Sequence, residues 1–263
     1  MVEIILAAVV VGVTGLIIGV LLSFAGEKFA VEVDGKELAV RDLLPGNNCG
    51  GCGYAGCDAL AKAIANGEAD VAACPVGGDP VAEKIGAVMG VEAGGGVKKV
   101  AFVKCSGSCD IAKNKYNYQG ISDCAQAVVV PGAGDKACSY GCLGLGTCVK
   151  ACPFDAISIV NGIAHVDKDK CKACSKCVAA CPKHLIELVP VDAPSIVACS
   201  SHDMAKRVME VCKTGCRGCT LCAKVCPEQA ITMDNGLAII DTEKCNGCGL
   251  CKEKCPAKVI RAV

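Results

Sequence analysis

The sequence predicts an α+β protein with one N-terminal transmembrane helix and several small domains that are organised around metal. Three observations lead to this prediction. An uncharged apolar run of 21 residues stands near the N-terminus, from Ile4 to Phe24. The 263-residue chain contains 25 cysteines, most of them in short runs with a repeated spacing. Segments of the second half also match one another, which indicates an internal duplication.

The composition narrows the class of protein. Cysteine makes up about a tenth of the chain, a density typical of disulfide scaffolds or of metal-binding proteins. Disulfide scaffolds are short and secreted, whereas cysteines in ligand-like runs indicate metal and a reducing compartment. The chain has no Trp and only 3% aromatic residues, so we expect metal binding to supply part of the folding free energy. Lys+Arg and Asp+Glu balance at 27 each, and no basic tract indicates nucleic-acid binding.

Residues 1–27 are predicted to form a membrane anchor. The run from Ile4 to Phe24 is long enough to cross a hydrocarbon core of about 30 Å as a helix. A cleaved signal peptide is the alternative. That alternative requires a basic start and a small-residue cleavage site, but the chain begins Met-Val-Glu and no AxA sequence follows the run.

One face of this run predicts contact with other membrane subunits. Small residues recur on it at spacings of three and four, and Gly15 and Gly19 form a GxxxG pair that lets another helix approach closely. Basic residues follow the run and none precedes it: Lys28, Lys36 and Arg41. Under the positive-inside rule, this asymmetry predicts a single-pass protein of the cell (inner) membrane, with the rest of the chain on the cytoplasmic side.

Residues 28–89 are predicted to form a small domain with four cysteines. Alternation from Phe29 to Val40 around Asp34-Gly35 predicts a hairpin. The apolar pattern from Ala59 to Ile64 predicts a short amphipathic helix. The sequence from Gly51 to Gly56 also spells GxGxxG, but a cysteine stands inside it. We interpret its glycines as tight turns beside the cysteines rather than as a dinucleotide site.

The cysteines of this domain follow the spacing CxxCx4Cx16CP. The stretch LPGNNCGGCGYAGC and this spacing resemble the iron–sulfur domain found in the B subunit of the Rnf complex and in corrinoid iron–sulfur proteins. The resemblance implies one [4Fe-4S] cluster with four ligands: Cys49, Cys52, Cys57 and Cys74.

Residues 90–130 are predicted to be a linker that is followed by a strand and further cysteines. The sequence GVEAGGGVKK, which starts at Gly90, is typical of a flexible linker. An apolar run from Val97 to Val103 then predicts a buried strand that leads to Cys105.

Residues 191–263 contain the spacing CxxCxxCxxxCP twice. This is the signature of two-cluster bacterial ferredoxins, in which the fourth cysteine of each run ligates the other cluster. It predicts a (βαβ)2-type ferredoxin module with two [4Fe-4S] clusters. One has the ligands Cys216, Cys219, Cys222 and Cys255, and the other has Cys245, Cys248, Cys251 and Cys226. A zinc site is the alternative, although zinc sites usually combine two CxxC pairs.

Residues 131–190 are predicted to form a first ferredoxin module of the same type. Its second run has the regular spacing, whereas its first run is spaced CxxxCxxxxxCxxxCP. The same cross-ligation rule predicts two clusters. One has the ligands Cys138, Cys142, Cys148 and Cys181, and the other has Cys171, Cys174, Cys177 and Cys152.

The internal duplication covers more than the ferredoxin runs. The stretch VKCSGSCDIAK (103–113) matches VACSSHDMAK (197–206) with one gap, and Cys138-x-x-x-Cys142 matches Cys212-x-x-x-Cys216. Five cysteines stand outside the five predicted clusters: Cys105, Cys109, Cys124, Cys199 and Cys212.

We hypothesise a sixth [4Fe-4S] cluster on these cysteines. Its ligands would be Cys105, Cys109 and Cys124, with Cys199 or Cys212 as the fourth. The alternative is that the five are buried thiols kept for packing. His202 stands where the first copy has Cys109, so a ligand role for it is a further hypothesis, whereas we interpret His165 and His184 as surface residues.

No Ser/His/Asp set, carboxylate pair or phosphate-binding loop is visible, so we predict no residues that act on an organic substrate. The cysteine runs instead predict a series of one-electron carriers. The order of parts, a membrane helix, the LPGNNCGGCGYAGC domain and ferredoxin modules, resembles the B subunit of the Rnf complex over nearly the whole chain. The chain departs from the shortest members of that family by its extra ferredoxin module and the Cys105 region.

The resemblance implies a subunit of a membrane-bound, ion-translocating ferredoxin:NAD oxidoreductase. Such a subunit accepts electrons from soluble reduced ferredoxin and passes them to membrane partners, which carry the flavin and nicotinamide chemistry and the ion path. Two other functions remain open. One is a membrane-tethered polyferredoxin that serves another terminal enzyme, such as a hydrogenase. The other is a metal-binding redox sensor that holds zinc or labile clusters.

Overall fold

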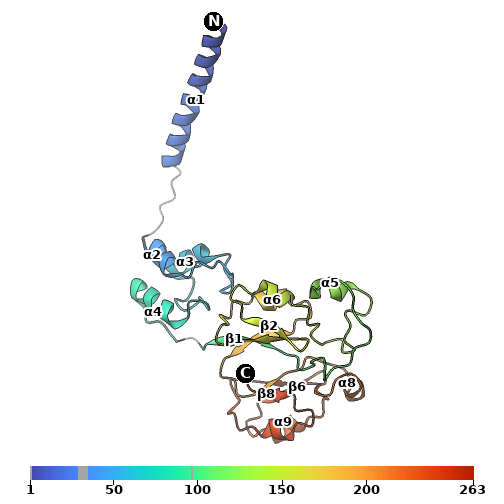
Figure 1. Ribbon diagram of the computed structural model, residues 1–263. Helices are drawn as coiled ribbons and strands as arrows, with labels where there is room; N and C mark the ends of the chain where they lie inside the picture. The colour runs from blue at the N-terminus through green and yellow to red at the C-terminus, as the bar shows by residue number, and fades with distance from the viewer. Residues whose placement is uncertain (1, 29–34, 96) are drawn as a thin grey trace.

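The computed structural model describes residues 2–28, 35–95 and 97–263. Helix α1 comprises Val2–Lys28 and stands apart from the other elements (Figure 1). Among the described residues, no helix is both long enough and apolar enough to cross a membrane. The transmembrane helix expected between Ile4 and Phe24 therefore stays a prediction.

Three helices form the four-cysteine domain: α2 (Gly35–Leu43), α3 (Cys57–Ala65) and α4 (Gly78–Met89). They meet at a core of Val40, Leu60, Ile64 and Ile85, each at most 1% exposed. Helix α3 confirms the amphipathic helix that the sequence predicts between the third and fourth cysteines.

The predicted hairpin of this domain is wrong in its second half. Residues 29–34 lie outside the described residues, but Gly35 to Val40 belong to helix α2. The side chains of Val40, Leu43 and Leu44 face the core at helical spacing, so packing against α3 and α4 determines the conformation of this segment.

The linker predicted after Gly90 is irregular, and Gly90 ends α4 in the left-handed conformation. Strand β1 (Lys99–Val103) follows, with its last four residues buried, and confirms the predicted strand. It pairs antiparallel with β4 (Ile186–Pro190), so that Lys99 lies opposite Pro190 and Val103 opposite Ile186. Strand β1 therefore packs with the first ferredoxin-like module, although it lies upstream of residue 131, the predicted start of that module.

The elements from β1 to β4 form the first of two ferredoxin-like halves, and those from β5 to β8 form the second. The first half contains a second strand pair and three short helices. Strands β2 (Ile157–Val160) and β3 (Ile163–Val166) form an antiparallel hairpin. The helices are α5 (Cys124–Val129), α6 (Thr147–Ala151) and α7 (Lys176–Ala180). Apart from α5, the elements run in the order β1-α6-β2-β3-α7-β4.

The second half repeats this order as β5-α9-β6-β7-α10-β8, with α8 in addition. Strand β5 pairs antiparallel with β8, and β6 with β7, as β1 pairs with β4 and β2 with β3. The strands are β5 (Ile196–Val197), β6 (Ile231–Asp234), β7 (Leu237–Ile240) and β8 (Ile260–Arg261). The helices are α8 (Ala205–Val211), α9 (Leu221–Val225) and α10 (Leu250–Lys254).

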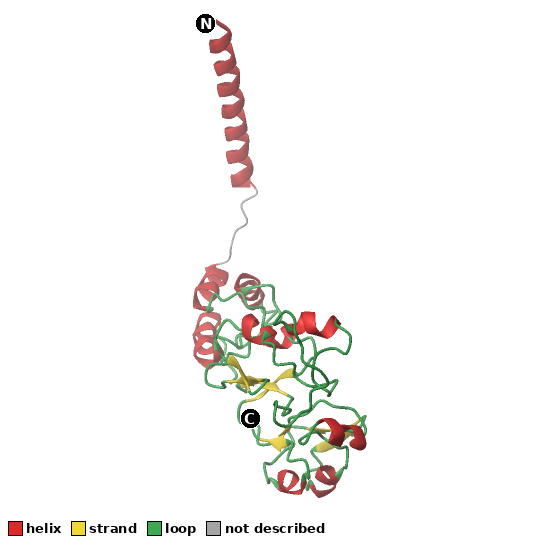
Figure 2. Ribbon diagram, turned by 45° about the vertical axis from the view of Figure 1, so that its right-hand side comes forward, coloured by secondary structure: helices red, strands yellow, loops and turns green. Residues whose placement is uncertain are grey.

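The two halves lie against each other, and loops make up most of both (Figure 2). Backbone hydrogen bonds join them directly: the N–H of Lys113 donates to the carbonyl of Val211 at 2.9 Å, and the N–H of Lys213 donates to that of Ile111 at 3.2 Å. These bonds bring Cys212 of the second half opposite Ala112 of the first. The cysteine-bearing loops of both halves therefore meet at one interface.

Candidate metal centres

Four short helices position the cysteines of both ferredoxin-like halves. Helices α6, α7, α9 and α10 each follow a residue in the left-handed conformation: Gly146, Ser175, Thr220 and Gly249. Each helix buries the third cysteine of its run and ends at the fourth, which has extended backbone and precedes a proline. The proline prevents continuation of the helix, so each helix ends at the fourth cysteine of its run.

The module 2 cavity, about 380 Å³, is lined by four cysteines from two different runs: Cys216, Cys219, Cys222 and Cys255. These are the four that the cross-ligation rule groups together. Burial, followed by the neighbouring thiols of Cys216 and Cys219, raises the pKa of Cys222 to about 11. The cavity wall also holds Arg217, whose buried Nε–H has no acceptor among the described residues. An anionic acceptor in this cavity would satisfy that donor.

The module 1 cavity, about 350 Å³, is lined by Cys124, Cys142, Cys148 and Cys181. Cys124 takes the place that the sequence assigns to Cys138, which does not line this cavity. The Asp123 carboxylate caps α5 by accepting from the N–H groups of Ala125 and Gln126, and the N–H of Cys124 donates to Thr147 Oγ1 at 2.6 Å. These bonds hold Cys124 beside α6.

The thiols of the module 1 cavity are close enough to affect one another. Burial raises the pKa of Cys148 to about 12, and the thiols of Cys142, Cys124 and Cys181 raise it further. As for Cys222, burial and then neighbouring thiols raise this pKa, which is expected of protonated thiols that lie close together in a buried group.

The inter-module cavity, about 440 Å³, lies between the two halves and is lined by Cys105, Cys138, Cys199 and Cys212. Of the five cysteines that the sequence leaves unassigned, it gathers three and adds Cys138. Burial is the main cause that raises the pKa of Cys199 to about 11. The N–H groups of Cys216 and Ser201 oppose this effect, and the thiols of Cys216 and Cys138 add to it. Cys109 is exposed and does not line this cavity.

Neighbouring thiols also raise pKa values within the other two predicted ferredoxin sets. Burial and then the thiols of Cys171, Cys174 and Cys152 raise the pKa of Cys177 to about 11. The N–H of Ala101 donates to the sulfur of Cys171 at 3.4 Å. In the second half, burial raises the pKa of Cys251, and the thiols of Cys245 and Cys248 add to this effect.

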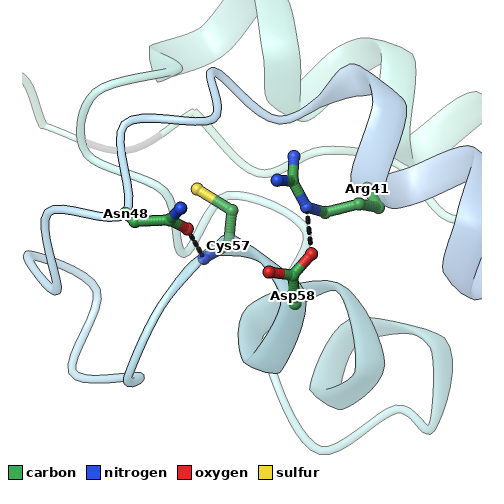
Figure 3. Close-up of polar contacts among 4 residues, drawn as sticks. All are labelled: Arg41, Asn48, Cys57 and Asp58. Carbon is green, nitrogen blue, oxygen red and sulfur yellow. Dashed lines mark hydrogen bonds and ion pairs between the residues drawn. The ribbon is translucent and has the colours of Figure 1, made fainter.

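The four-cysteine domain arranges its ligands through turns and side-chain hydrogen bonds (Figure 3). Asn48 Oδ1 accepts from the N–H of Cys57 at 2.8 Å, and Arg41 of α2 bonds to Asp58 at the start of α3. Gly56 packs closely against this bond, because a Cβ atom on it would lie 3.0 Å from Asn48 Oδ1 and the Asn48 side chain would have to shift.

Cys74 lies near the other cysteines of the same domain. Its sulfur accepts a 3.4 Å hydrogen bond from the N–H of Gly77. Burial is the largest cause of the raised pKa of Cys74, and the thiols of Cys52 and Cys57 raise it further.

The glycine-rich loop of this domain contacts the first ferredoxin-like half. A Cβ atom on Gly51 would lie 3.0 Å from the Cα of Cys174, so any larger residue would have to displace the backbone of Cys174. The GxGxxG pattern therefore brings the loop of Cys49 and Cys52 against a cysteine of the next set.

These arrangements fit iron–sulfur clusters by the chemistry of their donors. Thiolates are the usual ligands of such clusters, and hydrogen bonds to the sulfurs tune them. All 25 cysteines are free thiols, and several accept backbone N–H groups. Among the described residues, no three Cys, His, Asp or Glu side chains are arranged as ligands of a single metal ion. The cysteines instead surround cavities.

All three histidines are exposed, as predicted for His165 and His184. His202 packs edge-on against Tyr140 with a centroid distance of 5.6 Å, and its Nδ1 lies 3.3 Å from the carbonyl oxygen of Asn235. No contact in the described structure supports a ligand role for His202.

Three family models match the cysteine-bearing regions. Residues 44–76 match the family described as "Putative Fe-S cluster". Residues 133–182 match a 4Fe-4S dicluster domain, and residues 170–230 and 215–259 match a second model with the same description.

Curated proteins match most of the chain. The B subunit of a Na(+)-translocating ferredoxin:NAD(+) oxidoreductase complex from Acetobacterium woodii is 50% identical over 89% of this chain and 71% of its own length. A proton-translocating counterpart from Clostridium ljungdahlii is 42% identical over 90% of this chain and 84% of its own. The B subunit of an ion-translocating oxidoreductase complex from Methanosarcina acetivorans is 44% identical over 88% of this chain and 87% of its own.

Proposed function

Because the chain belongs to the family of B subunits of ion-translocating ferredoxin:NAD oxidoreductase (Rnf) complexes, we propose that its cysteine sets form an electron path within such a complex. The chain is an electron-transfer subunit of an ion-translocating oxidoreductase. Nicotinamide reduction and ion transport belong to partner subunits in this proposal.

The module 2 cavity is the main support for assigning iron–sulfur clusters to the cysteine sets. Cys216, Cys219 and Cys222 share a cavity with Cys255, which is more than thirty residues away in the sequence. This grouping is what the cross-ligation of two-cluster ferredoxins requires. A bound [4Fe-4S] cluster supplies a one-electron carrier there.

The ligands of four further clusters follow from the same reasoning. The four-cysteine domain contributes Cys49, Cys52, Cys57 and Cys74, and the module 1 cavity contributes Cys124, Cys142, Cys148 and Cys181. The remaining two sets are Cys171, Cys174, Cys177 and Cys152, and Cys245, Cys248, Cys251 and Cys226. Backbone N–H groups donate to the sulfurs of Cys74, Cys171 and Cys181 in these sets.

In this proposal the sets form a path through the molecule. The loop of Cys49 packs against Cys174 through Gly51, and the thiols of Cys177 and Cys148 interact electrostatically. Cys219 and Cys248 are exposed in the second half, which lies at the opposite end of the molecule from α1 (Figure 1). We therefore place the entry of electrons from soluble reduced ferredoxin at the second half, and their exit toward the four-cysteine domain.

The run from Ile4 to Phe24 supports a single-pass anchor that places the four-cysteine domain next to membrane partners. The basic residues after the run support a location of the clusters on the cytoplasmic side of the cell (inner) membrane.

The proposal is tested on the complex purified from membranes, with reduced ferredoxin as donor and NAD as acceptor. We expect ferredoxin-dependent NAD reduction that falls to background in Cys248→Ala. His165→Ala is the control, because the His165 side chain is exposed and lines none of the three cysteine cavities. Purification of the chain with a hydrogenase and without nicotinamide activity would instead establish a tethered polyferredoxin. Zinc in place of iron would exclude both of these electron-transfer functions.

A further inference from the structure

We propose that the inter-module cavity is a sixth [4Fe-4S] site, with Cys105, Cys138, Cys199 and Cys212 as ligands and Lys136 as its charge-compensating residue. The proposal rests on the iron–sulfur function proposed above and deepens it, because the site connects the two ferredoxin-like halves. It also replaces the ligand set that the sequence suggested, in which Cys109 and Cys124 took part.

The internal duplication relates the four cysteines in pairs. Cys105 of the first copy matches Cys199 of the second, and Cys138 matches Cys212. Each copy therefore contributes the same two cysteines to one cavity at the interface. The site therefore receives two equivalent ligands from each copy of the unit.

The hydrogen bonds of the cavity obey the same symmetry. The N–H of Cys142 donates to the sulfur of Cys105 at 3.4 Å, and the N–H of Cys216 donates to the sulfur of Cys199 at 3.4 Å. Cys142 and Cys216 are themselves matching residues of the duplication. Such equivalence would not be expected of two thiols that are kept only for packing.

The wall of the cavity brings sulfurs from both halves together. A Cβ atom placed on Gly107 would lie 3.7 Å from the sulfur of Cys105 and 3.7 Å from that of Cys212. The two sulfurs are therefore no more than twice that distance apart. The cavity, about 440 Å³, is also similar in size to the module 1 and module 2 cavities, at about 350 and 380 Å³.

Lys136 is an independent indication of an anionic occupant. Its side chain lines the cavity and is 3% exposed, which makes it the only buried charged residue in the described part of the chain. Its Nζ donates to the carbonyls of Gly107 and Gly162, at 2.7 and 2.8 Å. No ion pair of Lys136 occurs among the described residues. A buried ammonium with only neutral acceptors is costly unless an anion lies nearby, and a four-thiolate cluster is anionic.

Cys138 is available for this site because Cys124 completes the neighbouring one. The regular run in the second half has Cys219 between Cys216 and Cys222, whereas the first half has no cysteine between Cys142 and Cys148. Cys124 lines the module 1 cavity and supplies the missing thiol. Every cysteine except Cys109 then has a place in a group of four.

Cys109 has a different role, which its partner in the duplication reveals. The N–H of Cys109 donates to the carbonyl of Asn161 at 2.9 Å, and His202 lies against the carbonyl of Asn235. Asn161 and Asn235 occupy the turns of the matching hairpins β2–β3 and β6–β7. Both residues therefore cover a hairpin turn, so Cys109 provides a matched control.

The first experiment compares iron and acid-labile sulfide in Cys212→Ala, Cys109→Ala and the unaltered complex, purified anaerobically. We expect Cys212→Ala to lose about four irons and four sulfides per chain and Cys109→Ala to lose none. Full iron in Cys212→Ala, or a loss in Cys109→Ala, would overturn the proposal. The iron count does not depend on NAD reduction, so a complex that keeps this pattern but lacks activity would count against the proposed function alone.

A second experiment keeps all ligands and removes the charge. In Lys136→Met, the iron content should stay unchanged, and one component of the electron paramagnetic resonance spectrum should shift to lower reduction potential in a redox titration, because the reduced, more negative cluster loses a stabilising cation. Lys113→Met is the control, because Lys113 is exposed and its carbonyl accepts from the N–H of Ala137, the residue next to Lys136, at 2.8 Å. Unchanged potentials of all components in Lys136→Met would contradict the site.

Discussion

Cys105 and Cys199 occupy matching positions in the two halves of the molecule and line one cavity between them. The sulfur of each accepts a 3.4 Å hydrogen bond from the N–H of another cysteine, Cys142 in one half and Cys216 in the other. The cavity is thus connected by equivalent bonds to the module 1 and module 2 cavities.

Cys124 and Cys138 should belong to different groups of ligands, because they line different cavities. Each single alanine variant should lose about four irons per chain, and the Cys124→Ala/Cys138→Ala double variant about eight, since losses at independent sites add. Iron analysis of the three variants decides the matter. A double variant that loses no more than either single variant would place both cysteines in one cluster.

Gly51 should be required for electron transfer but not for cluster assembly. In Gly51→Val the side chain would overlap the backbone of Cys174, and such overpacking costs about 1–3 kcal/mol unless the contact opens. We expect full iron content and a several-fold slower ferredoxin-dependent NAD reduction. Gly94→Ala is the control, because a Cβ there meets no atom within 4 Å. An unchanged rate in Gly51→Val would show that this contact is not on the electron path.

The metal-free fold should lose stability as the pH rises above about 9. Burial is the first cause of the raised pKa values of Cys148, about 12, and of Cys177, Cys199 and Cys222, each about 11. The folded chain therefore holds these protons more tightly than the unfolded chain, whose thiols titrate near 9.0. This contribution to stability is complete below the unfolded value and is lost as the pH rises toward the folded values.

The measurement is thermal unfolding of chelator-treated and iron-loaded protein between about pH 8 and about pH 10.5. The transition temperature of the metal-free protein should fall over this range. That of the loaded protein should fall less, because its ligands have already lost their protons. Parallel curves for the two forms would refute the role of the buried thiols.

Gly15 and Gly19 should matter for assembly with membrane partners. No atom of the described structure lies within 4 Å of a Cβ placed on either residue, so leucines there leave the chain's own packing intact. The Gly15→Leu/Gly19→Leu variant should keep its iron but co-purify with less of its partner subunits, whereas the alanine pair should assemble normally. Full recovery of partners with the leucine pair would rule out this face as a docking surface.

The sequence predicted the parts of this molecule that depend on local spacing. Regular CxxCxxCxxxCP runs led to the cysteines of the module 2 cavity, and apolar periodicity led to α3 and β1. The hairpin expected up to Val40 failed, because packing against α3 and α4 determines α2. Alternation over a few residues does not contain that information.

Spacing alone could not predict that Cys124 lines the module 1 cavity and Cys138 the inter-module cavity, because both cavities gather cysteines from distant segments. Two signals nevertheless pointed to it. The run from Cys142 to Cys148 lacks the middle cysteine of a regular triplet, and Cys138 matches Cys212, which lies outside the regular triplet of the second half. The interface between the halves decides which thiols meet there, and that interface depends on tertiary packing.

The most direct test of this account is the number of four-iron units on one chain, counted by native mass spectrometry of the anaerobically purified protein. The account predicts six units in the unaltered chain, one for each group of four cysteines, and five in Cys212→Ala. Five units in both proteins would contradict the site between the two halves and leave the modules without the connection proposed for them.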